Sequence, residues 1–245
     1  VVMGQSALLN LAGWQVAALT HDRSTRFLHY APLSFDVSYQ EIFPTLASGG
    51  TVVAREPADR RDFPALVRRV AEAGVTHLFL PAAALRPFAR TAADLDVRLP
   101  ALRHLCVSGE QLVVDDDVRG LFSRLDGCEL VNLYGPTETN AATAHVLAGE
   151  PETWPAHVPI GRPLPGVAAY VLDRNGRLAP PGVPGELYLG GACLADGYLN
   201  DPVRTAAGFV PDRFGPDPDA RVYRTGDYVI RDEQGVLVYL GRVDT

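Results

Sequence analysis

The stretch 132–138, Asn-Leu-Tyr-Gly-Pro-Thr-Glu, places an aromatic ring, a tight turn, a hydroxyl and a carboxylate directly after an apolar run. Residues 129–133 are typical of a short buried strand, and the Gly-Pro pair that follows cannot continue it. The side chains of Tyr134, Thr137 and Glu138 are therefore expected at the carboxyl end of the strand. Open parallel sheets bind their ligands at that edge.

Each of these side chains offers chemistry that suits a nucleotide. The face of Tyr134 can stack on a purine, the Thr137 hydroxyl can meet a phosphate, and the Glu138 carboxylate can hold a magnesium that bridges phosphates. The alternative is a polar turn that caps a helix, with Thr137 or Thr139 as the N-cap. One short motif does not decide between the two.

Composition and charge narrow the class of protein. The 245 residues are 47% apolar, which is enough for one large α/β domain or two smaller ones. A net charge of -7 argues against a nucleic-acid surface, because counterion release needs a basic face. No segment approaches 18 uninterrupted apolar residues and no signal-peptide pattern is present, so a cytoplasmic location without membrane contact is expected.

The cysteines and histidines give no metal-site pattern. Cys106, Cys128 and Cys193 are an odd number, widely spaced in apolar or Gly-rich surroundings, which favours reduced thiols in a core. The six histidines show no ligand spacing either. All 22 basic residues are arginine, and the chain contains no lysine.

The pattern over residues 26–146 alternates short apolar runs with amphipathic stretches. Strands are predicted at residues 27–30, 51–54, 76–80, 102–107 and 129–133. Helices are predicted at residues 39–46, 63–73, 82–90 and 115–125, the last opening on an acidic run that suits a helix start. This alternation indicates an α/β fold, a mostly parallel sheet covered by helices.

After residue 151 proline and glycine become frequent and the apolar runs shorten. Strands are predicted at residues 167–172, 186–189, 228–231 and 236–240, separated by turn signals such as Asn175-Gly176 and Gln234-Gly235. We therefore expect an α/β subdomain over 1–150, followed by a smaller β-rich, barrel-like subdomain over 151–245. The predicted boundary falls near 150–159.

Three further segments accompany the first motif, in a fixed order. They are Phe-Asp-Val-Ser at 35–38, Gly-Glu-Leu-Tyr-Leu-Gly-Gly at 185–191 running to Gly-Tyr-Leu at 197–199, and Tyr-Arg-Thr-Gly-Asp at 223–227 followed by Tyr-Leu-Gly-Arg-Val-Asp at 239–244. Together the motifs resemble the adenylation domains of nonribosomal peptide synthetases, within the acyl-adenylate-forming, AMP-binding superfamily. The resemblance covers essentially the whole chain and implies the central portion of the large amino-terminal domain of such enzymes.

The resemblance implies a role for each nucleotide-site residue. Tyr134 would stack on adenine, whose amino edge Asn132 would touch. Thr137 would contact phosphate and Glu138 would hold Mg²⁺, which makes these two the catalytic candidates. The other implied nucleotide-binding residues are Gly109, Glu110, Gly135, Tyr239, Asp227 and Arg242.

Asp227 and Arg242 would bind the ribose hydroxyls. A carboxylate can accept two hydroxyl hydrogen bonds, and an arginine fork adds donors. Taken singly, Asp227 could be a turn residue after Gly226, and Arg242 a solvated strand end.

Asp36 bears on the class of substrate. In peptide synthetases an aspartate at this place pairs with the α-ammonium of an amino acid, an interaction that is strong only where water is partly excluded. The alternative is an N-cap for the helix at 39–46, for which Ser38 is an equally good candidate.

The resemblance also implies a pocket for the amino-acid side chain. Small residues would dominate it, with Gln40 and Ser108 as polar handles. One lining position falls on one of the three alanines at 82–84, which the sequence does not distinguish, and we assign it to Ala83. The implied lining is Val37, Gln40, Ala83, Cys106, Ser108, Leu133, Ala141 and Ala142.

The implied activity is that of an amino-acid adenylating ligase in secondary metabolite biosynthesis. The substrate carboxylate attacks the α-phosphorus of ATP, pyrophosphate leaves, and the aminoacyl group later passes to a thiol of phosphopantetheine on a carrier protein. The implied partners are that carrier protein and the neighbouring synthetase domains. Magnesium and cationic donors stabilise the charge on the phosphates. The family carries one lysine in a phosphate loop expected just before Val1 and another beyond the hinge expected at Thr245, so weak or absent turnover by this chain alone is predicted.

Two other readings of the sequence remain open. One is part of an acyl- or aryl-CoA ligase-like enzyme, which has related chemistry but no ammonium anchor. The other is a non-catalytic binding segment of a larger multidomain protein. Loss of amino-acid binding on replacing Asp36 would favour the synthetase over the first of these.

Overall fold

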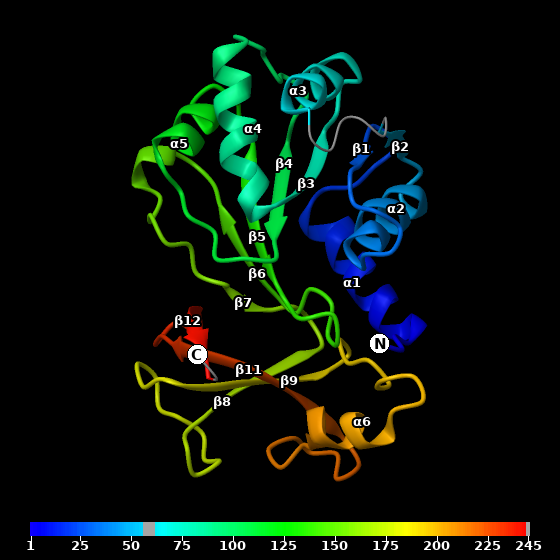
Figure 1. Ribbon diagram of the computed structural model, residues 1–245, viewed down its shortest axis with the longest axis vertical. Helices are drawn as coiled ribbons and strands as arrows, with labels where there is room; N and C mark the ends of the chain where they lie inside the picture. Colours follow the sequence, from blue (N-terminus) through cyan, green and yellow to red (C-terminus); the bar gives the residue numbers. More distant parts are fainter. Residues whose placement is uncertain (56–61, 244–245) are drawn as a thin grey trace. The chain divides into compact units, whose positions relative to one another are not determined.

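The computed structural model describes residues 1–55 and 62–243, and its elements are drawn in Figure 1. The chain forms two compact units. The α/β unit comprises Ala12–Asn132 and Val146–Val158, and the β unit comprises Val1–Leu11, Leu133–His145 and Pro159–Thr245. Helix α1 (Gln5–Ala18) contains the first crossing between the units.

Parallel strands form the sheet of the α/β unit. Their order is β2-β1-β3-β4-β5, and every neighbouring pair is parallel. Parallel neighbours need crossover connections, which α2 (Val37–Ala47), α3 (Phe63–Glu72), α4 (Ala82–Asp94) and α5 (Asp116–Phe122) supply. The strands are β1 (Arg26–His29), β2 (Thr51–Ala54), β3 (His77–Pro81), β4 (His104–Ser108) and β5 (Glu129–Tyr134).

Side-chain alternation along these strands builds the core. Leu78, Leu80 and Leu105 are buried on the face that packs against α3, α4 and α5. The register pairs Phe79 with Cys106, so both point to the opposite face. The helices of this unit are α2 (Val37–Ala47), α3 (Phe63–Glu72), α4 (Ala82–Asp94) and α5 (Asp116–Phe122), with a short 3-10 helix at Pro151–Thr153.

Local capping explains two of the helix starts. Asp62 accepts a hydrogen bond from the Ala65 amide at the start of α3. Asp115 does the same with the Val118 amide at the start of α5, whose first turn holds the expected acidic residues. Helix α1 was not predicted, because its sequence is apolar on nearly every side and shows no helical periodicity.

The β unit holds an antiparallel sheet in the order β10-β11-β9-β8, with β12 also paired to β11. Its core includes Ile160, Val171, Leu187, Leu189 and Val229. The elements are β6 (Thr143–Leu147), whose last two residues belong to the α/β unit, β7 (Arg162–Pro163), β8 (Val167–Leu172), β9 (Gly185–Gly191), α6 (Pro202–Gly208), β10 (Phe209–Pro211), β11 (Arg221–Arg231) and β12 (Leu237–Arg242).

The observed units differ from a division at residue 150. The residues 133–145 belong with the later strands, because Thr143 pairs with Pro163 and the Ala142 carbonyl accepts from the Leu164 amide. Residues 146–158 belong instead to the α/β unit, where Leu147, Trp154 and Val158 join its core.

The predicted fold class is confirmed: a parallel sheet with helices, and a smaller antiparallel β-rich part. All three cysteines are free and buried, as expected. Burial raises the pKa of the Cys128 and Cys193 thiols to about 12, so they stay protonated. Among the described residues, no helix has the length and apolarity that crossing a bilayer requires.

Candidate nucleotide and substrate site

The loop after β5 closes on itself in a turn. The Ala142 amide donates to the Tyr134 carbonyl over 2.8 Å, and the Thr139 amide donates to the Pro136 carbonyl. Gly135 is required here, since a Cβ at this position would lie 1.6 Å from the Asn140 carbonyl oxygen. The described chain has no helix after Thr137 or Thr139, so the alternative of a helix cap is wrong.

The phenol of Tyr134 meets the carboxylate of Asp227. Its hydroxyl donates to Asp227 Oδ2 over 2.5 Å. Burial, followed by the negative charge of Asp227, raises the pKa of Tyr134, so the phenol stays protonated and donates. The aromatic and acidic residues predicted to serve one nucleotide therefore touch each other within the β unit.

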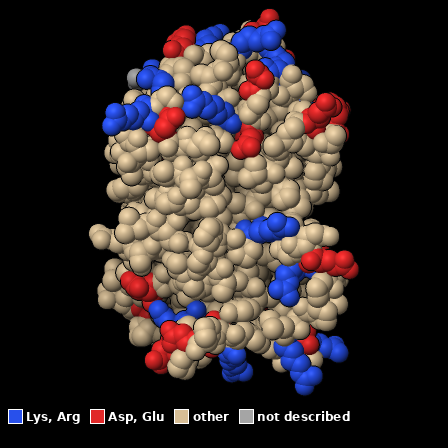
Figure 2. All heavy atoms as spheres, turned by 180° about the vertical axis from the view of Figure 1, so that it is seen from behind, with Lys and Arg blue, Asp and Glu red and all other residues tan. Residues whose placement is uncertain are grey.

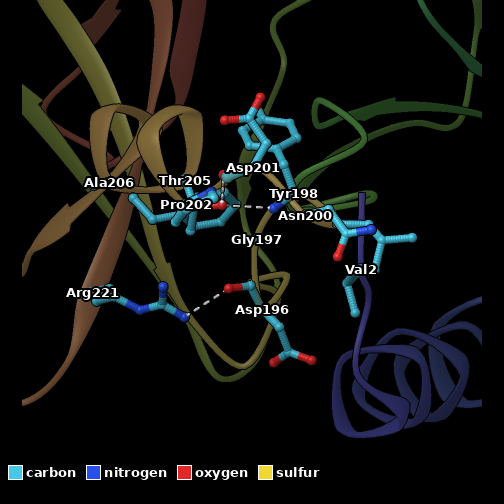
Figure 3. Close-up of a pocket in the computed structure, with 12 residues that line it drawn as sticks. Val2, Asp196, Gly197, Tyr198, Asn200, Asp201, Pro202, Thr205, Ala206 and Arg221 are labelled. Atoms are coloured by element: carbon cyan, nitrogen blue, oxygen red, sulfur yellow. Dashed lines mark hydrogen bonds between the residues drawn. The ribbon is translucent and has the colours of Figure 1, made fainter.

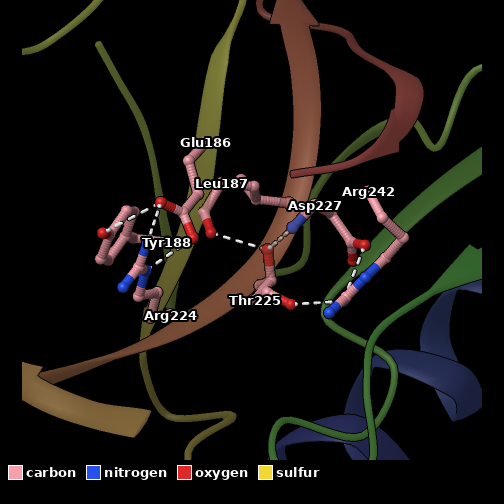
Figure 4. Close-up of polar contacts among 7 residues, drawn as sticks. All are labelled: Glu186, Leu187, Tyr188, Arg224, Thr225, Asp227 and Arg242. Atoms are coloured by element: carbon pink, nitrogen blue, oxygen red, sulfur yellow. Dashed lines mark hydrogen bonds and ion pairs between the residues drawn. The ribbon is translucent and has the colours of Figure 1, made fainter. Parts of the chain in front are cut away.

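A bulge in β11 aims Asp227. Three residues of β11, Thr225, Gly226 and Asp227, stand opposite the single residue Leu187 of β9. The Thr225 hydroxyl donates to the Leu187 carbonyl over 2.7 Å and accepts from the Asp227 amide over 3.0 Å, as Figure 4 shows.

Arg242 reaches the same bulge from the neighbouring strand. It is the cross-strand partner of Asp227, and its Nη1 donates to Asp227 Oδ1 over 3.2 Å and to the Thr225 carbonyl over 2.8 Å. Gly226 has a φ of +72°, and a Cβ there would lie 2.8 Å from Arg242 Nη2. Asp227 is thus a buried, hydrogen-bonded carboxylate rather than an ordinary turn residue.

A second ion pair holds the strand on the other side of the bulge. Arg224 donates to both carboxylate oxygens of Glu186, over 2.7 and 3.0 Å, and Tyr188 donates to the same carboxylate (Figure 4). Such two-point arginine contacts fix geometry as well as charge.

Glu138 is 9% exposed and accepts a hydrogen bond from the Tyr198 hydroxyl at Oε1. In the described residues no group of three or more His, Cys, Asp or Glu could hold a metal by itself. A single carboxylate does fit a magnesium that arrives on phosphates, because Mg²⁺ in such sites takes one or two carboxylates with phosphate oxygens and water. Thr137, beside it, is exposed.

Asp36 precedes α2 in the α/β unit. It occupies the N-cap position, yet among the described residues its side chain makes no capping hydrogen bond. The Ser38 hydroxyl donates instead to the Phe35 carbonyl over 2.7 Å. Neither side chain acts as a cap, so the half-buried Asp36 carboxylate is available for another partner.

A cavity of about 250 Å³ opens in the same unit. Of the predicted pocket residues, Val37 and Ser108 line it. Cys106 lies on the same sheet face as Phe79, which also lines the cavity. The whole lining is Tyr30, Ala31, Pro32, Phe35, Val37, Phe79, Pro81, Ser108 and Gly109.

The other predicted pocket residues are distributed between the units. Gln40 is buried in α2, and Ala83 is exposed on α4, whereas Ala84 packs into the core. Leu133, Ala141 and Ala142 belong to the β unit. Ala142 is fully buried in the core of that unit, which is a packing position.

The remaining predicted nucleotide residues divide in the same way. Asn132 is buried in β5 of the α/β unit and pairs with Val107, which faces the helical core. Gly109, with a φ of +96°, lines the cavity, and Glu110 is exposed next to it. Tyr239 is half-buried in β12 and packs on the core of the β unit, as Tyr134 does. The expected hinge at Thr245 lies outside the described residues.

On the face of the described chain shown in Figure 2, acidic and basic side chains are interspersed. No large area of a single charge sign covers this one face of the described residues.

Sequence reasoning missed Tyr198, Tyr223 and Thr225 as site residues. All three stood in the quoted motifs, but no role followed from their types alone. Tyr198 is 60 residues from Glu138, and only the fold brings its hydroxyl to that carboxylate.

Comparison with known proteins places this geometry in a family. Residues 1–199 match the family described as AMP-binding enzyme. The chain is 43% identical over 238 residues to a probable non-canonical nonribosomal peptide synthetase, CymA, of Salinispora arenicola. The aligned region covers 97% of this chain but 3% of that protein.

Two solved structures extend the comparison. The nonribosomal peptide synthetase FmoA3 superposes with a TM-score of 0.89 at 31% identity, over 99% of this chain and 26% of that one. The Vibrio cholerae adenylation domain AlmE, in complex with glycyl-adenosine-5'-phosphate, superposes with a TM-score of 0.83 at 26% identity, over 99% of this chain and 45% of that one. The chain spans less than half the length of each of these three proteins. It belongs to the AMP-binding enzymes, and within them to the adenylation domains of the nonribosomal peptide synthetase type.

Proposed function

We propose that this chain is part of an adenylation domain that activates an amino acid with ATP, for loading onto the phosphopantetheine thiol of a carrier protein. The observation that carries the proposal is that Tyr134 and Arg242 both donate to the carboxylate of Asp227. In the reaction a carboxylate oxygen of the amino acid bonds to the α-phosphorus, and the bond from that phosphorus to pyrophosphate breaks. The glycyl adenylate bound by AlmE is a ligand of the proposed type.

The β unit would hold the nucleotide. Tyr134 offers its ring to adenine, while its hydroxyl fixes the Asp227 carboxylate that accepts from the ribose hydroxyls. Arg242 adds positive charge and further donors beside that carboxylate. Thr137 would donate to a phosphate, and Glu138 would hold the Mg²⁺ that neutralises phosphate charge when bound.

The α/β unit would hold the amino acid. The Asp36 carboxylate, which is not used as a helix cap, would pair with the α-ammonium, and the cavity beside it would receive the side chain. Replacing Asp36 with alanine should abolish amino-acid binding while ATP binding persists. An Asp116→Ala control removes an equally negative, exposed carboxylate from the same unit and should change neither.

Calorimetry with the proteinogenic amino acids, in the presence of ATP, measures the effect. Amino-acid binding that survives the loss of Asp36 would exclude the ammonium role.

A second candidate is activation of an acid that has no ammonium group. It is favoured by the cavity lining, which includes Phe35 and Val37 on either side of Asp36 but no charged side chain. Under this candidate benzoate-type acids bind the wild-type chain, and the Asp36→Ala substitution leaves their binding intact.

The chain contains no lysine, whereas the resemblance described above implies two in the family. We therefore expect this chain alone to bind its ligands yet to show weak or absent amino-acid-dependent ATP–pyrophosphate exchange. Brisk exchange, measured with labelled pyrophosphate, would contradict that expectation.

A further inference from the structure

Glu138 is tied at two points to a loop that lies far from it in the sequence. The Glu138 backbone carbonyl accepts from the Ala195 amide over 2.9 Å, and Oε1 of its side chain accepts from the Tyr198 hydroxyl. Both partners lie in the loop after β9, within the same unit. Glu138 is thus held both by its backbone and by its side chain.

Tyr198 is itself held on three sides. Its amide donates to the Thr205 hydroxyl over 2.9 Å, a bond drawn in Figure 3. The Arg204 guanidinium carbon lies 4.1 Å from the centre of its ring, and the Phe209 ring meets it edge-on at 5.9 Å between ring centres. These contacts fix the direction of the hydroxyl.

The backbone before Tyr198 also depends on this arrangement. Gly197 has a φ of +146°, and a Cβ there would lie 2.5 Å from Thr205 Cγ2. Thr205 in turn donates its hydroxyl to the Asp201 carbonyl over 2.8 Å, at the start of α6. Glycine is therefore needed for the close approach of α6 to the loop.

A second phenol stands behind the first. The Tyr223 hydroxyl lies 3.4 Å from the Tyr198 hydroxyl. The Tyr198 hydroxyl therefore has two polar neighbours, the Glu138 carboxylate to which it donates and the Tyr223 hydroxyl.

We propose that Tyr198 is a positioning residue that orients Glu138 toward a divalent cation carried on the nucleotide. This inference rests on the proposed function, because it needs Glu138 to serve that cation. Carboxylates that bind metals are commonly oriented by hydrogen bonds from neighbouring groups, and loss of such a partner typically costs about 10- to 100-fold in metal affinity.

A neutral phenol suits the role better than a cationic donor. An arginine or lysine beside Glu138 would offset the negative charge that attracts the cation, whereas a phenol fixes the carboxylate and leaves that charge in place. The ring packing of Tyr198 is independent of its hydroxyl. A Tyr198→Phe substitution therefore keeps the contacts with Arg204 and Phe209 and removes only the hydroxyl, with its contacts to Glu138 and Tyr223.

The test measures ATP binding by calorimetry as the MgCl₂ concentration is varied, and again in EDTA. For Tyr198→Phe we expect the half-maximal Mg²⁺ concentration to rise by about 10-fold or more, with ATP affinity in EDTA unchanged. A Tyr170→Phe control removes a phenol that donates to Asp212 over 3.2 Å in the same unit. It should leave the Mg²⁺ requirement as it is.

A second variant guards against misfolding of the first. Arg204 is exposed, so an Arg204→Gln substitution should preserve the fold while it removes the cation–π contact with the Tyr198 ring. It should raise the Mg²⁺ requirement too, but by less.

If Tyr198→Phe leaves the Mg²⁺ requirement unchanged while the wild-type chain depends on Mg²⁺, the positioning role of Tyr198 is overturned and the proposed function is not. Wild-type ATP binding that ignores Mg²⁺ overturns the metal role of Glu138, and no ATP binding at all overturns the proposed function.

Discussion

Tyr134 and Asp227 are separated by 93 residues, yet the phenol of the first donates a 2.5 Å hydrogen bond to the carboxylate of the second. One is at the end of a strand and the other in a bulge of β11. The contact joins the aromatic surface proposed for the base to the carboxylate proposed for the sugar, so the two parts of the proposed nucleotide site are structurally coupled.

That coupling separates two substitutions. Asp227→Ala should weaken ATP binding by more than 10-fold, because it removes the proposed acceptor for the ribose hydroxyls, and a hydrogen bond to a charged group contributes about 1.5–3 kcal/mol. Tyr134→Phe keeps the aromatic face and should weaken binding less. Titration calorimetry with ATP compares the two, and equal losses would show that Asp227 does not contact the nucleotide.

Gly226 gives a prediction with an internal control. A Gly226→Ala substitution adds a Cβ 2.8 Å from Arg242 Nη2 at a φ of +72°, so it should displace the arginine and weaken ATP binding several-fold. Gly176→Ala imposes the same backbone strain at a φ of +73°, but nothing lies within 4 Å of the new atom. Both should lose stability, by about 1 kcal/mol from strain, and only the first should lose nucleotide affinity. Thermal melts and ATP titrations separate the two effects.

Gly135 should tolerate no side chain. The added Cβ would lie 1.6 Å from the backbone oxygen of Asn140, and backbone cannot step aside as a flexible side chain can. Gly135→Ala should therefore open the turn that carries Glu138 and lower the melting temperature markedly. Gly120→Ala, with open space around the new atom and a helical backbone, should be neutral or stabilising by up to about 1 kcal/mol. An undiminished melting temperature for Gly135→Ala would contradict the observed turn.

Buried histidines predict how stability depends on pH. His21, His77 and His104 lie in a row in the α/β unit, with tilted rings whose centres are 4.4 and 4.9 Å apart. Burial, together with the nearby His77 and His104 rings, lowers the pKa of His21 from 6.5 to about 3. Burial is also the main cause that lowers the pKa of His104 to about 4 and that of His77 below its ordinary value.

These groups bind protons in the unfolded chain below pH 6.5 but resist protonation in the folded one. Their contribution to stability is therefore complete above pH 6.5 and falls as the pH drops toward about 4. Urea unfolding between pH 7.5 and 4.5 measures the slope. His21→Phe should flatten the slope of stability against pH, because phenylalanine does not titrate. The substitution keeps an aromatic ring against Phe27 and breaks no hydrogen bond, since neither nitrogen of His21 has a hydrogen-bond partner among the described residues. An unaltered slope would mean that the carboxylates dominate it.

The sequence by itself determined the fold class and the bounds of several strands. Runs such as Thr51–Ala54 and Val167–Leu172 became strands with the predicted bounds, because apolar periodicity and turn residues act over a few neighbours. The motif around Tyr134 and the one ending in Asp227 could be named for the same reason. Their roles as nucleotide ligands and the identity of the substrate stay predictions.

Tertiary structure decided which groups meet. The bulge that turns Asp227 toward Tyr134 and Arg242, and the clamp that aims Tyr198 at Glu138, join residues far apart in the chain through strand register and ring packing. The division into units was decided in the same way, since the residues 133–145 pack with strands that follow them by dozens of positions. Local residue types carry no record of such partners, because register and packing depend on all the strands at once.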